Sequence, residues 1–475
     1  MTKIQGNTYN DDFLYQVLKN RDRRFDGRFF FGTTTTGVYC RPICPVRRPK
    51  RENYLFFESA AKAEKAGFRP CLRCHPEFAP AEGHDPDGMR IVTLAANLLR
   101  GDGDFSEGGM HEVSDRLGVS DRHLRRLFVE HYGVSPIQYA QTQRLLFARK
   151  LIFETDLSFT QIAMAANFGS VRRMNALFHE RYGCNPTQMR RGKRTEGGDI
   201  ILRIPYSPPY AWREMLEYLS ACAVRGVEEV TDDAYRRTVS IFAKGQWYRG
   251  WLAIKDDAEN AALLVQLDQT LVPVLATVVA RLKRLFDTDC RPADSEGALR
   301  GLCGKRPGLR LPGCFDTFEI AVRVVLGTVV AEGISTLGEP IETPFSALRR
   351  LFPSPDEAVV LSQGALREAG ITEAESNTMR CIADAARKGA LDAGADIEAQ
   401  IAHLATLPGV DAHAAQKIAM HALDWPDAFS PLEPCVRESF PGKSTDEILA
   451  AAEIWRPWRA YATMHLWHET NHHTT

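Results

Sequence analysis

Four cysteines near the N-terminus have the spacing of a metal site. Cys40 and Cys44 form a C-x3-C pair in "GVYCRPICPVRRPKREN", and Cys71 and Cys74 form a C-x2-C pair in "GFRPCLRCHPE". Two such pairs supply four thiolates, which bind Zn²⁺ tetrahedrally. The spacing therefore predicts one Zn²⁺ on the four cysteines. Two roles are open at this point: the zinc holds together a small domain with little core, or it also activates a thiolate.

The residues around the cysteines carry a resemblance that favours the second role. The sequence from Arg28 to Pro76 resembles, almost without interruption, the N-terminal domain of the Ada DNA-repair regulators. In that family the first cysteine of the cluster takes the methyl group from a methylphosphotriester in DNA, and the other three complete the zinc site. The resemblance therefore implies that Cys40 is both a zinc ligand and the methyl acceptor. The alternative is a zinc-stabilised regulator that senses something other than alkylation.

The charges around Cys40 suit this chemistry. Zinc keeps the sulfur as a thiolate near neutral pH, and the thiolate is the nucleophile. Arg41, Arg47 and Arg48 are predicted to hold the DNA backbone close to it. Four thiolates on Zn²⁺ carry two net negative charges, which repel phosphate, and methylating one sulfur removes one of them. We therefore expect methylation to strengthen DNA binding by about 1–2 kcal/mol after screening.

A helical repeat follows the zinc domain. "LFVEHYGVSP" (127–136) aligns with "LFHERYGCNP" (177–186), so two equivalent helical units are predicted, each ended by a Gly and then a Pro. Upstream of each copy lies a helix-turn-helix pattern, in which a Gly makes the turn and a Ser caps the second helix. The turn and cap residues are Gly118 and Ser120 in the first unit, and Gly169 and Ser170 in the second.

The second helix of each unit begins with residue types that bind DNA. Side chains early on a recognition helix reach base edges and phosphates. These positions hold Arg122, His123, Arg125 and Arg126 in the first unit, and Arg172, Arg173 and Asn175 in the second. An ordinary helical bundle also places Gly between helices, but two copies with Arg-rich second helices favour DNA binding. The block resembles the double helix-turn-helix domain of AraC-type activators, which implies double-stranded DNA and RNA polymerase as partners.

The composition divides the chain into a basic front and an acidic back. Residues 1–194 carry 31 Lys and Arg against 21 Asp and Glu, a net charge of +10, and residues 195–475 carry 28 against 39, a net charge of −11. A polyanion therefore suits the front. No apolar run is long enough to span a bilayer, and the N-terminus does not resemble a signal peptide. We expect a cytoplasmic, nucleoid-associated bacterial protein with reduced cysteines.

The pattern changes from Ile200 onward. Residues 200–222 predict a strand, a proline turn and an amphipathic helix, and the alternation in "RRTVSIFAKGQWYRGWLAIKDD" and "ALLVQLD" predicts further strands. This block resembles the N-terminal domain of AlkA-type 3-methyladenine DNA glycosylases. The stretches 308–327 and 454–469 resemble the helical domain that follows it in those enzymes.

The predicted architecture is therefore multidomain α+β, because 475 residues are too many for one core. It combines a small zinc domain, an all-α double helix-turn-helix, an α+β domain like the AlkA N-terminal domain, and an all-α domain like the helix-hairpin-helix glycosylases. The predicted boundaries of these four domains are 1–82, 86–194, 199–300 and 301–470.

Two short elements that carry glycosylase chemistry depart from the AlkA pattern. The hairpin "LPGVDAHAA" has Asp411 at the second glycine, where a carboxylate repels phosphate. His413 stands where lyase-type relatives carry a Schiff-base lysine, so no β-lyase chemistry is implied. Glu433 stands at the catalytic aspartate, four residues after a Phe, and its longer arm moves the carboxylate by about one methylene. The alternative for Glu433 is a solvated surface acid.

The sequence as a whole predicts a regulator of the repair of alkylated DNA. Cys40 accepts a methyl group in a self-inactivating transfer, and the methylated protein activates transcription. Two hypotheses stay open for the back half: a glycosylase that excises alkylated bases, or an AlkA-like module that has lost catalysis and binds DNA or has a structural role. We expect excision of 3-methyladenine or 7-methylguanine to be weak or absent.

Overall fold

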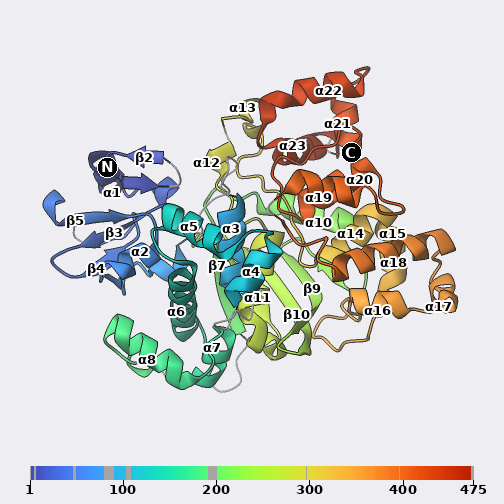
Figure 1. Cartoon of the computed structure of the whole chain (residues 1–475). Helices are drawn as coiled ribbons and strands as arrows, with labels where there is room; N and C mark the ends of the chain where they lie inside the picture. The colour runs from blue at the N-terminus through green and yellow to red at the C-terminus, as the bar shows by residue number, and fades with distance from the viewer. Residues whose placement is uncertain are drawn as a thin grey trace. The chain divides into compact units, whose positions relative to one another are not determined.

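The computed structural model forms two compact units (Figure 1). The residues that it describes are 2–4, 7–46, 50–79, 90–102, 109–190, 200–295, 297–394 and 396–471. The first unit lies within Met1–Ser207, Glu259–Ala280 and Thr288–Arg291. The second unit lies within Pro208–Ala258, Arg281–Asp287 and Pro292–Thr475.

A four-stranded sheet in the order β5-β3-β4-β6 carries the four cysteines. Its strands are β3 (Phe30–Thr33), β4 (Val38–Cys40), β5 (Tyr54–Phe57) and β6 (Arg69–Pro70). The flanking elements are β1 (Thr2–Ile4), β2 (Asn7–Tyr9), α1 (Asp11–Asn20) and α2 (Ala60–Lys65). Aromatic residues such as Phe29, Phe31 and Tyr54 contribute to this core, because small domains depend on a few large side chains for buried apolar area.

The helical block of the first unit follows the repeat in the sequence. Its helices are α3 (Arg90–Asn97), α4 (Gly109–Arg116), α5 (Asp121–Tyr132), α6 (Pro136–Glu154), α7 (Phe159–Ala165), α8 (Val171–Tyr182) and α9 (Pro186–Met189). Ser120 and Ser170 cap α5 and α8 as predicted, each accepting a backbone N–H three residues later. Gly133 and Gly183 end these helices with φ of 69° and 67°.

The turn of the second helix-turn-helix differs from the prediction. Gly118 makes the first turn with φ of 66°, as expected. In the second helix-turn-helix the left-handed residue is Asn167, with φ of 53°, and Gly169 has no positive φ. The prediction for Gly169 was therefore wrong. Asn adopts this conformation at low cost because its short polar side chain hydrogen-bonds locally.

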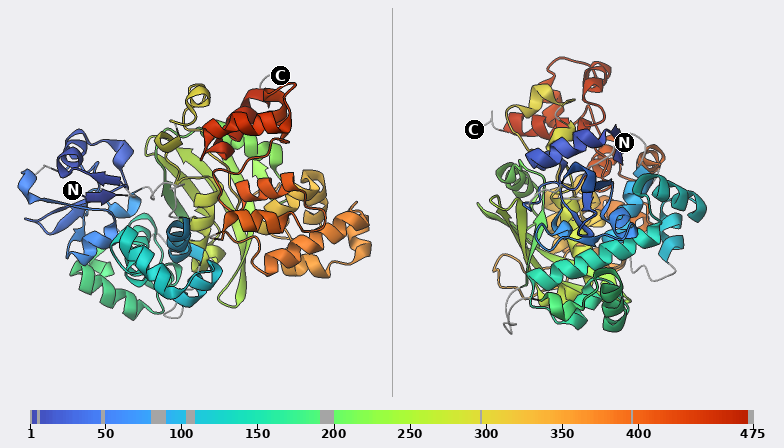
Figure 2. Two further views of the ribbon diagram at one scale, coloured as in Figure 1. Left: turned by 45° about the horizontal axis from the view of Figure 1, so that its top comes forward. Right: turned by 90° about the vertical axis from the view of Figure 1, so that its left-hand side faces the viewer.

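The strands predicted after Ile200 are present. β7 (Ile200–Pro205) pairs antiparallel with β11 (Ala262–Leu267) in the first unit, and α11 (Leu275–Leu285) follows β11. In the second unit, α10 (Trp212–Cys222) precedes β8 (Glu228–Val230), β9 (Ala234–Ala243) and β10 (Gln246–Asp257), which pair antiparallel in sequence order. Lys244 and Gly245, with φ of 52° and 76°, form the tight β9–β10 turn, and the long hairpin is drawn in yellow-green in Figure 2.

Helices make up the rest of the second unit. They are α12 (Pro292–Ser295), α13 (Arg300–Cys303), α14 (Thr317–Leu326), α15 (Thr328–Ser335), α16 (Pro355–Val360), α17 (Gln363–Glu368), α18 (Glu373–Arg387), α19 (Ile397–Leu404), α20 (Ala412–His421), α21 (Pro434–Ser439), α22 (Thr445–Ala452) and α23 (Arg459–Asn471). A buried ion pair between Arg237 and Glu319, 2.6 Å apart, joins β9 to α14.

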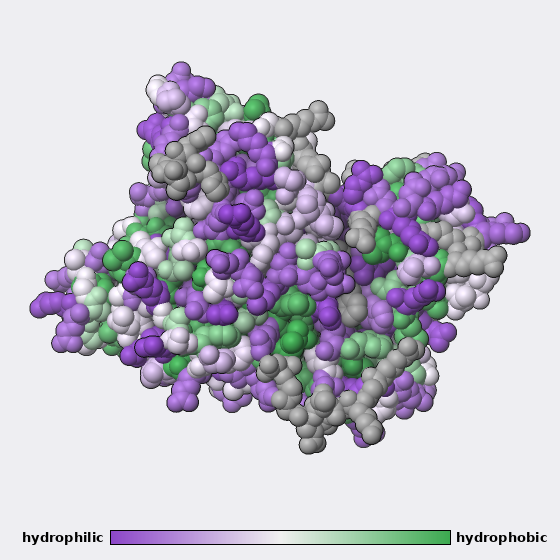
Figure 3. All heavy atoms as spheres, turned by 180° about the vertical axis from the view of Figure 1, so that it is seen from behind, coloured by the Kyte–Doolittle hydropathy of each residue, from purple (hydrophilic) through white to green (hydrophobic). Residues whose placement is uncertain are grey.

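The surface of the molecule is mixed in character. On the face drawn in Figure 3, hydrophobic residues lie in small groups among hydrophilic ones. Singly exposed apolar side chains such as Val329 and Ile454 are ordinary on protein surfaces. Among the helices that the structure describes, none is long and apolar enough to cross a bilayer.

The multidomain α+β class predicted from the sequence is confirmed.

Candidate functional site

The sheet brings the four cysteines to one point. Cys40 is the last residue of β4 and Cys71 is the first after β6. Because β4 and β6 are parallel neighbours, both pairs of cysteines begin at the same edge of the sheet. Their sulfur atoms all lie within 4.8 Å of one another, and the residues are buried. Tetrahedral zinc with Zn–S bonds of about 2.3 Å places sulfurs about 3.8 Å apart, so the four cysteines fit one Zn²⁺.

Backbone amides support the sulfurs of this cluster. The N–H of Arg41 donates to Cys74 Sγ at 3.4 Å, and the N–H of Arg73 donates to Cys71 Sγ at 3.3 Å. Such donors stabilise thiolate charge and fix the orientation of the ligands. The chemistry available here is that of a zinc-held thiolate, as the spacing predicted.

Arg41 has a different environment from the one that the sequence suggested. Its guanidinium is ion-paired with Asp26 and donates to the Cys74 carbonyl oxygen at 3.4 Å. The Arg41 side chain is only 12% exposed. Arg41 therefore positions the loop that holds the cluster, and its predicted phosphate contact stays a prediction. Arg47 and Arg48 lie outside the described residues.

Helix α6 packs directly behind the zinc cluster. Arg149 of α6 is fully buried and donates to Glu77 Oε2 at 2.8 Å and to the Cys71 carbonyl oxygen at 3.0 Å. Thr142 of the same helix donates to Glu64 Oε2 at 3.0 Å. Burial raises the pKa of Glu64 to about 7, against the hydrogen bond from Thr142 that lowers it. Three polar contacts, made by two side chains of α6, therefore join the zinc domain to the helix that connects α5 with α7.

The predicted DNA-binding side chains are placed for that role on α5 and α8. Arg122, Arg125, Arg126, Arg172 and Arg173 are exposed, and His123 and Asn175 are half-buried. All lie in the first turns of their helices, just after the Ser caps. Arg126 already has partners on its own helix: Glu130 at 3.1 Å and the His123 ring at 3.2 Å. Direct contacts of these residues with DNA stay a prediction.

Glu433 in the second unit is the centre of a small charged cluster. Its Oε1 lies 3.3 Å from Lys417 Nζ, and its Oε2 lies 3.4 Å from His413 Nε2. The Glu433 side chain is 13% exposed, so the alternative of a solvated surface acid was wrong. Lys417 was not among the predicted site residues, although its spacing of four from His413 places both on one face of α20.

The hairpin before α20 is built differently from the AlkA pattern. Gly409 has φ of 81°, and a Cβ there would lie 2.3 Å from Thr378 Oγ1, so glycine is required. Asp411 has φ of −85° and caps α20 by accepting the N–H of Ala414 at 2.7 Å. The backbone of Asp411 is therefore unstrained. Its carboxylate accepts the hydrogen bond of a backbone N–H at the start of the helix, which is the kind of group that binds a phosphate.

An aromatic pair includes a tyrosine whose hydroxyl is affected by the Glu433 charge. Tyr218 of α10 and Trp467 of α23 meet edge to face, with ring centroids 5.1 Å apart. Burial raises the pKa of the Tyr218 hydroxyl, and the Glu433 charge adds to the rise. Burial also lowers the pKa of His421, which lies 3.1 Å from that hydroxyl, to about 4. Aromatic faces can stack a flipped base. This pair could not be predicted from a local pattern, because its members lie far apart along the chain.

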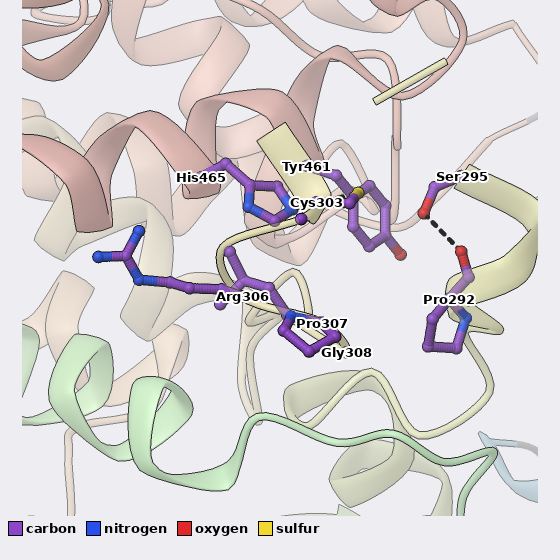
Figure 4. Close-up of a pocket in the computed structure, with 10 residues that line it drawn as sticks. Pro292, Ser295, Cys303, Arg306, Pro307, Gly308, Tyr461 and His465 are labelled. Atoms are coloured by element: carbon purple, nitrogen blue, oxygen red, sulfur yellow. Dashed lines mark hydrogen bonds between the residues drawn. The ribbon is translucent and has the colours of Figure 1, made fainter. Parts of the chain in front are cut away.

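A cavity of about 320 Å³ lies elsewhere in the second unit (Figure 4). Cys303 of α13 and His465 of α23 line it, with Sγ and Nε2 3.7 Å apart. Burial lowers the pKa of His465 to about 4, so the ring is neutral at pH 7 and a weak base for the thiol. None of the site residues predicted from the sequence lines this cavity.

Three family models match segments of the chain. The metal binding domain of Ada matches residues 14–77, a helix-turn-helix domain matches residues 113–192, and the AlkA N-terminal domain matches residues 201–316. The order of these matches is the order predicted from the sequence, and the last match runs past the predicted boundary at residue 300.

Three curated proteins are similar to different lengths of the chain. A "probable bifunctional transcriptional activator/DNA repair enzyme AlkA" of Mycobacterium tuberculosis is 34% identical over 98% of this chain and 97% of its own length. The DNA-3-methyladenine glycosylase 2 of Escherichia coli is 34% identical over 55% of this chain and 95% of its own length. The bifunctional transcriptional activator/DNA repair enzyme Ada of Escherichia coli is 34% identical over 38% of this chain and 49% of its own length.

Proposed function

Because the chain belongs to the family of bifunctional Ada/AlkA transcriptional activators and DNA repair enzymes, we propose that it senses and repairs alkylated DNA through Cys40. Cys40 takes the methyl group of a DNA methylphosphotriester, and the methylated protein activates transcription. The observation that carries this proposal is the cluster of four buried sulfurs within 4.8 Å. A metal cluster with a basic sequence around its first cysteine suits a nucleophile that works beside phosphate.

The transfer is a single displacement. Zinc, when bound to the four cysteines, keeps their sulfurs as thiolates near neutral pH. The Cys40 sulfur attacks the methyl carbon, an S–C bond forms, the C–O bond to the phosphotriester breaks, and the phosphodiester regains its negative charge. The thioether does not release the methyl group, so each molecule turns over once. The change also removes one negative charge that repelled the DNA backbone, and this is the switch toward tighter binding.

Transcription activation rests on the two recognition helices. α5 and α8 present exposed arginines in their first turns, where such side chains reach the major groove and phosphates. We expect the methylated protein to bind its operator with a steep dependence on salt. RNA polymerase is the partner that activation requires, and chromosomal DNA in the cytoplasm is the expected site of action.

Intact-mass measurement tests the role of Cys40. The zinc-loaded protein is mixed with DNA that carries methylphosphotriesters, and we expect one added methyl group on Cys40, located by peptide mapping. Cys40→Ala should remain unmodified, while Cys184→Ala, at a cysteine outside the cluster, should take up the methyl group like wild type. Wild-type protein that gains no methyl group would contradict the proposal.

The back half is proposed to excise alkylated bases, with Glu433 supporting the developing sugar cation. Glu433 is a partly buried carboxylate, which is the kind of group that can support the sugar cation formed as the base leaves. Lys417 offsets part of its charge, so we expect slow release of 3-methyladenine and 7-methylguanine. A base-release assay on alkylated DNA, with Glu433→Gln as the inactive variant, tests this role.

A second candidate for the back half is a DNA-binding or structural module without catalysis. One observation favours it: Asp411 fills the helix N-terminus at which the hairpin would hold a phosphate. The same assay separates the two candidates, because equal release by wild type and Glu433→Gln at background level is the result expected of a non-catalytic module.

A further inference from the structure

The cluster around Glu433 contains a primary amine next to the carboxylate. Lys417 Nζ lies 3.3 Å from Glu433 Oε1. The Lys417 side chain is 29% exposed and the Glu433 side chain 13%, so both are largely packed but reachable from solvent. His413, one turn earlier on α20, approaches the other carboxylate oxygen. Any sugar held against this carboxylate therefore also meets the amine.

We propose that Lys417 attacks the aldehyde of abasic deoxyribose in DNA, so that the second unit acts as an abasic-site lyase. This inference rests on the proposed function, because that function places a deoxyribose against Glu433. It changes the expectation drawn from the sequence, where the absence of lyase chemistry depended on position 413 alone. The structure brings an amine to the same carboxylate from position 417, one helical turn further along.

The proposed reaction needs only water and the residues present. The ring-opened abasic sugar exposes an aldehyde at C1′. The neutral amine of Lys417 adds to C1′, an N–C bond forms, and the C1′ oxygen leaves as water to give an imine. Loss of a proton from C2′ then forms a C2′–C3′ double bond and expels the 3′ phosphate. Hydrolysis of the remaining imine returns Lys417 unchanged.

The neighbours of Lys417 supply the proton transfers. Glu433 is the nearest acceptor for the proton that the amine must lose. The His413 ring lies 3.4 Å from Glu433 and is held on its other side by Ser430 Oγ, 2.8 Å from Nδ1. A carboxylate and an imidazole on one hydrogen-bonded path can exchange the protons of both imine formation and elimination. The imidazole itself has no primary amine, so among these groups only Lys417 can form the imine.

The alternative is a purely structural role, in which Lys417 only stabilises the fold by its ion pair with Glu433. Lys417→Arg separates the two roles, since arginine keeps the positive charge but is not an imine-forming amine. Lys443→Arg is the matched control: Lys443 lies in the same unit, with its Nζ 5.0 Å from the Phe440 ring centroid. It does not belong to the Glu433 cluster.

Borohydride trapping tests the inference directly. The full-length zinc-loaded protein is incubated with a duplex that contains one preformed abasic site, and sodium borohydride reduces any imine to a stable protein–DNA bond. We expect wild type and Lys443→Arg to be trapped equally and Lys417→Arg to lose at least about tenfold in adduct. Peptide mapping should place the adduct on Lys417, and strand cleavage at the abasic site should fall in parallel.

The outcomes are separable from those of the proposed function. The abasic site is made beforehand, so trapping does not require base excision. Release of methylated bases without any adduct would overturn the lyase inference and leave the glycosylase in place. Adduct that persists undiminished in Lys417→Arg, or that is missing in wild type, would also overturn it. Adduct on Lys417 without base release would support the lyase and remove the glycosylase.

Discussion

The zinc cluster of the first unit was predicted from cysteine spacing and Glu433 of the second unit from a resemblance, and the surroundings of the two sites differ. The four cysteines meet within 4.8 Å, and backbone amides of Arg41 and Arg73 support their sulfurs. Glu433 instead meets two side chains that the resemblance did not nominate as partners, Lys417 and His413. The first site has the ligands that its sequence motif implies, and the second has neighbours on which its proposed chemistry depends.

The difference shows what a short motif can specify. A zinc site is set by four ligands in two local pairs, and the metal itself selects their geometry. A single carboxylate has no such constraint, because its charge and reactivity depend on whatever residues other elements place beside it. Substitutions or zinc removal at one site at a time therefore test whether the two sites depend on each other.

Loss of zinc should give the largest effect, confined to the first unit. Structural zinc contributes on the order of 10 kcal/mol to folding, so chelation or Cys71→Ser should unfold the sheet that holds the cluster. All seven tryptophans lie between residues 212 and 467, in the second unit. We therefore expect far-UV circular dichroism to change while tryptophan emission stays constant. Cys184→Ser is the matched control, and a shift of tryptophan emission on chelation would contradict the independence of the two sites.

A substitution in the hairpin should affect the second unit in turn. In Gly409→Ala the new Cβ meets Thr378 at a residue with positive φ, and we expect a loss of about 3 kcal/mol in unfolding free energy. Gly442→Ala measures the cost of the positive φ alone, because Gly442 also has positive φ but an added Cβ would meet nothing within 4 Å. That control should lose about 1 kcal/mol. Denaturant unfolding followed by tryptophan emission measures both, and equal losses would show that Thr378 yields to the added methyl group.

The buried glutamate beside α6 should make the stability of the first unit depend on pH. The pKa of Glu64 is raised to about 7 in the folded protein, so the native state binds more protons than the unfolded state above the ordinary value of 4.5. Stability should fall as pH rises from about 4.5 to 7. Glu64→Gln removes this penalty and should stabilise the protein by about 2 kcal/mol at pH 8, and by much less at pH 5. Thermal melts of the zinc-loaded protein at the two pH values measure this, with the exposed Glu180→Gln as control.

Single arginines on the recognition helices should give the smallest effect. Arg125→Ala and Arg172→Ala should each weaken operator binding by about 1 kcal/mol and reduce the slope of log affinity against log salt by about 1. Arg225→Ala in the second unit, at a side chain 92% exposed, should leave both values unchanged. An equal loss with Arg225→Ala would show that the acidic half also contributes to operator binding.

Local signals in the sequence predicted much of the fold. The repeat, the Ser caps at 120 and 170 and the terminal glycines all depend on residues within one or two turns of each other, and the structure has them as predicted. The cysteine cluster was predictable for the same reason, since the two cysteines of each pair are only three or four residues apart. The prediction that Gly169 makes the second turn was wrong, because Asn167, two residues earlier, takes the left-handed conformation.

Contacts between distant residues could not be predicted in the same way. The ion pair of the Arg41 guanidinium with Asp26, from another part of the zinc domain, was not predicted, and the contact of Arg41 with DNA stays a prediction. Glu433 could not be separated from a surface acid, because its two partners come from a different helix. In each case the deciding partner is chosen by the tertiary fold, and no local pattern records it.

The contact of Arg149 with the zinc domain also bears on how such fused proteins exchange their parts. A guanidinium with no solvent exposure is matched to Glu77 and to the Cys71 carbonyl oxygen across the junction of two modules. Recombination that kept the zinc module and replaced the helical one would leave Glu77 buried without its cation, which costs about 3–5 kcal/mol. The two modules are therefore inherited most safely as one piece, whereas a junction without a buried charge would tolerate shuffling.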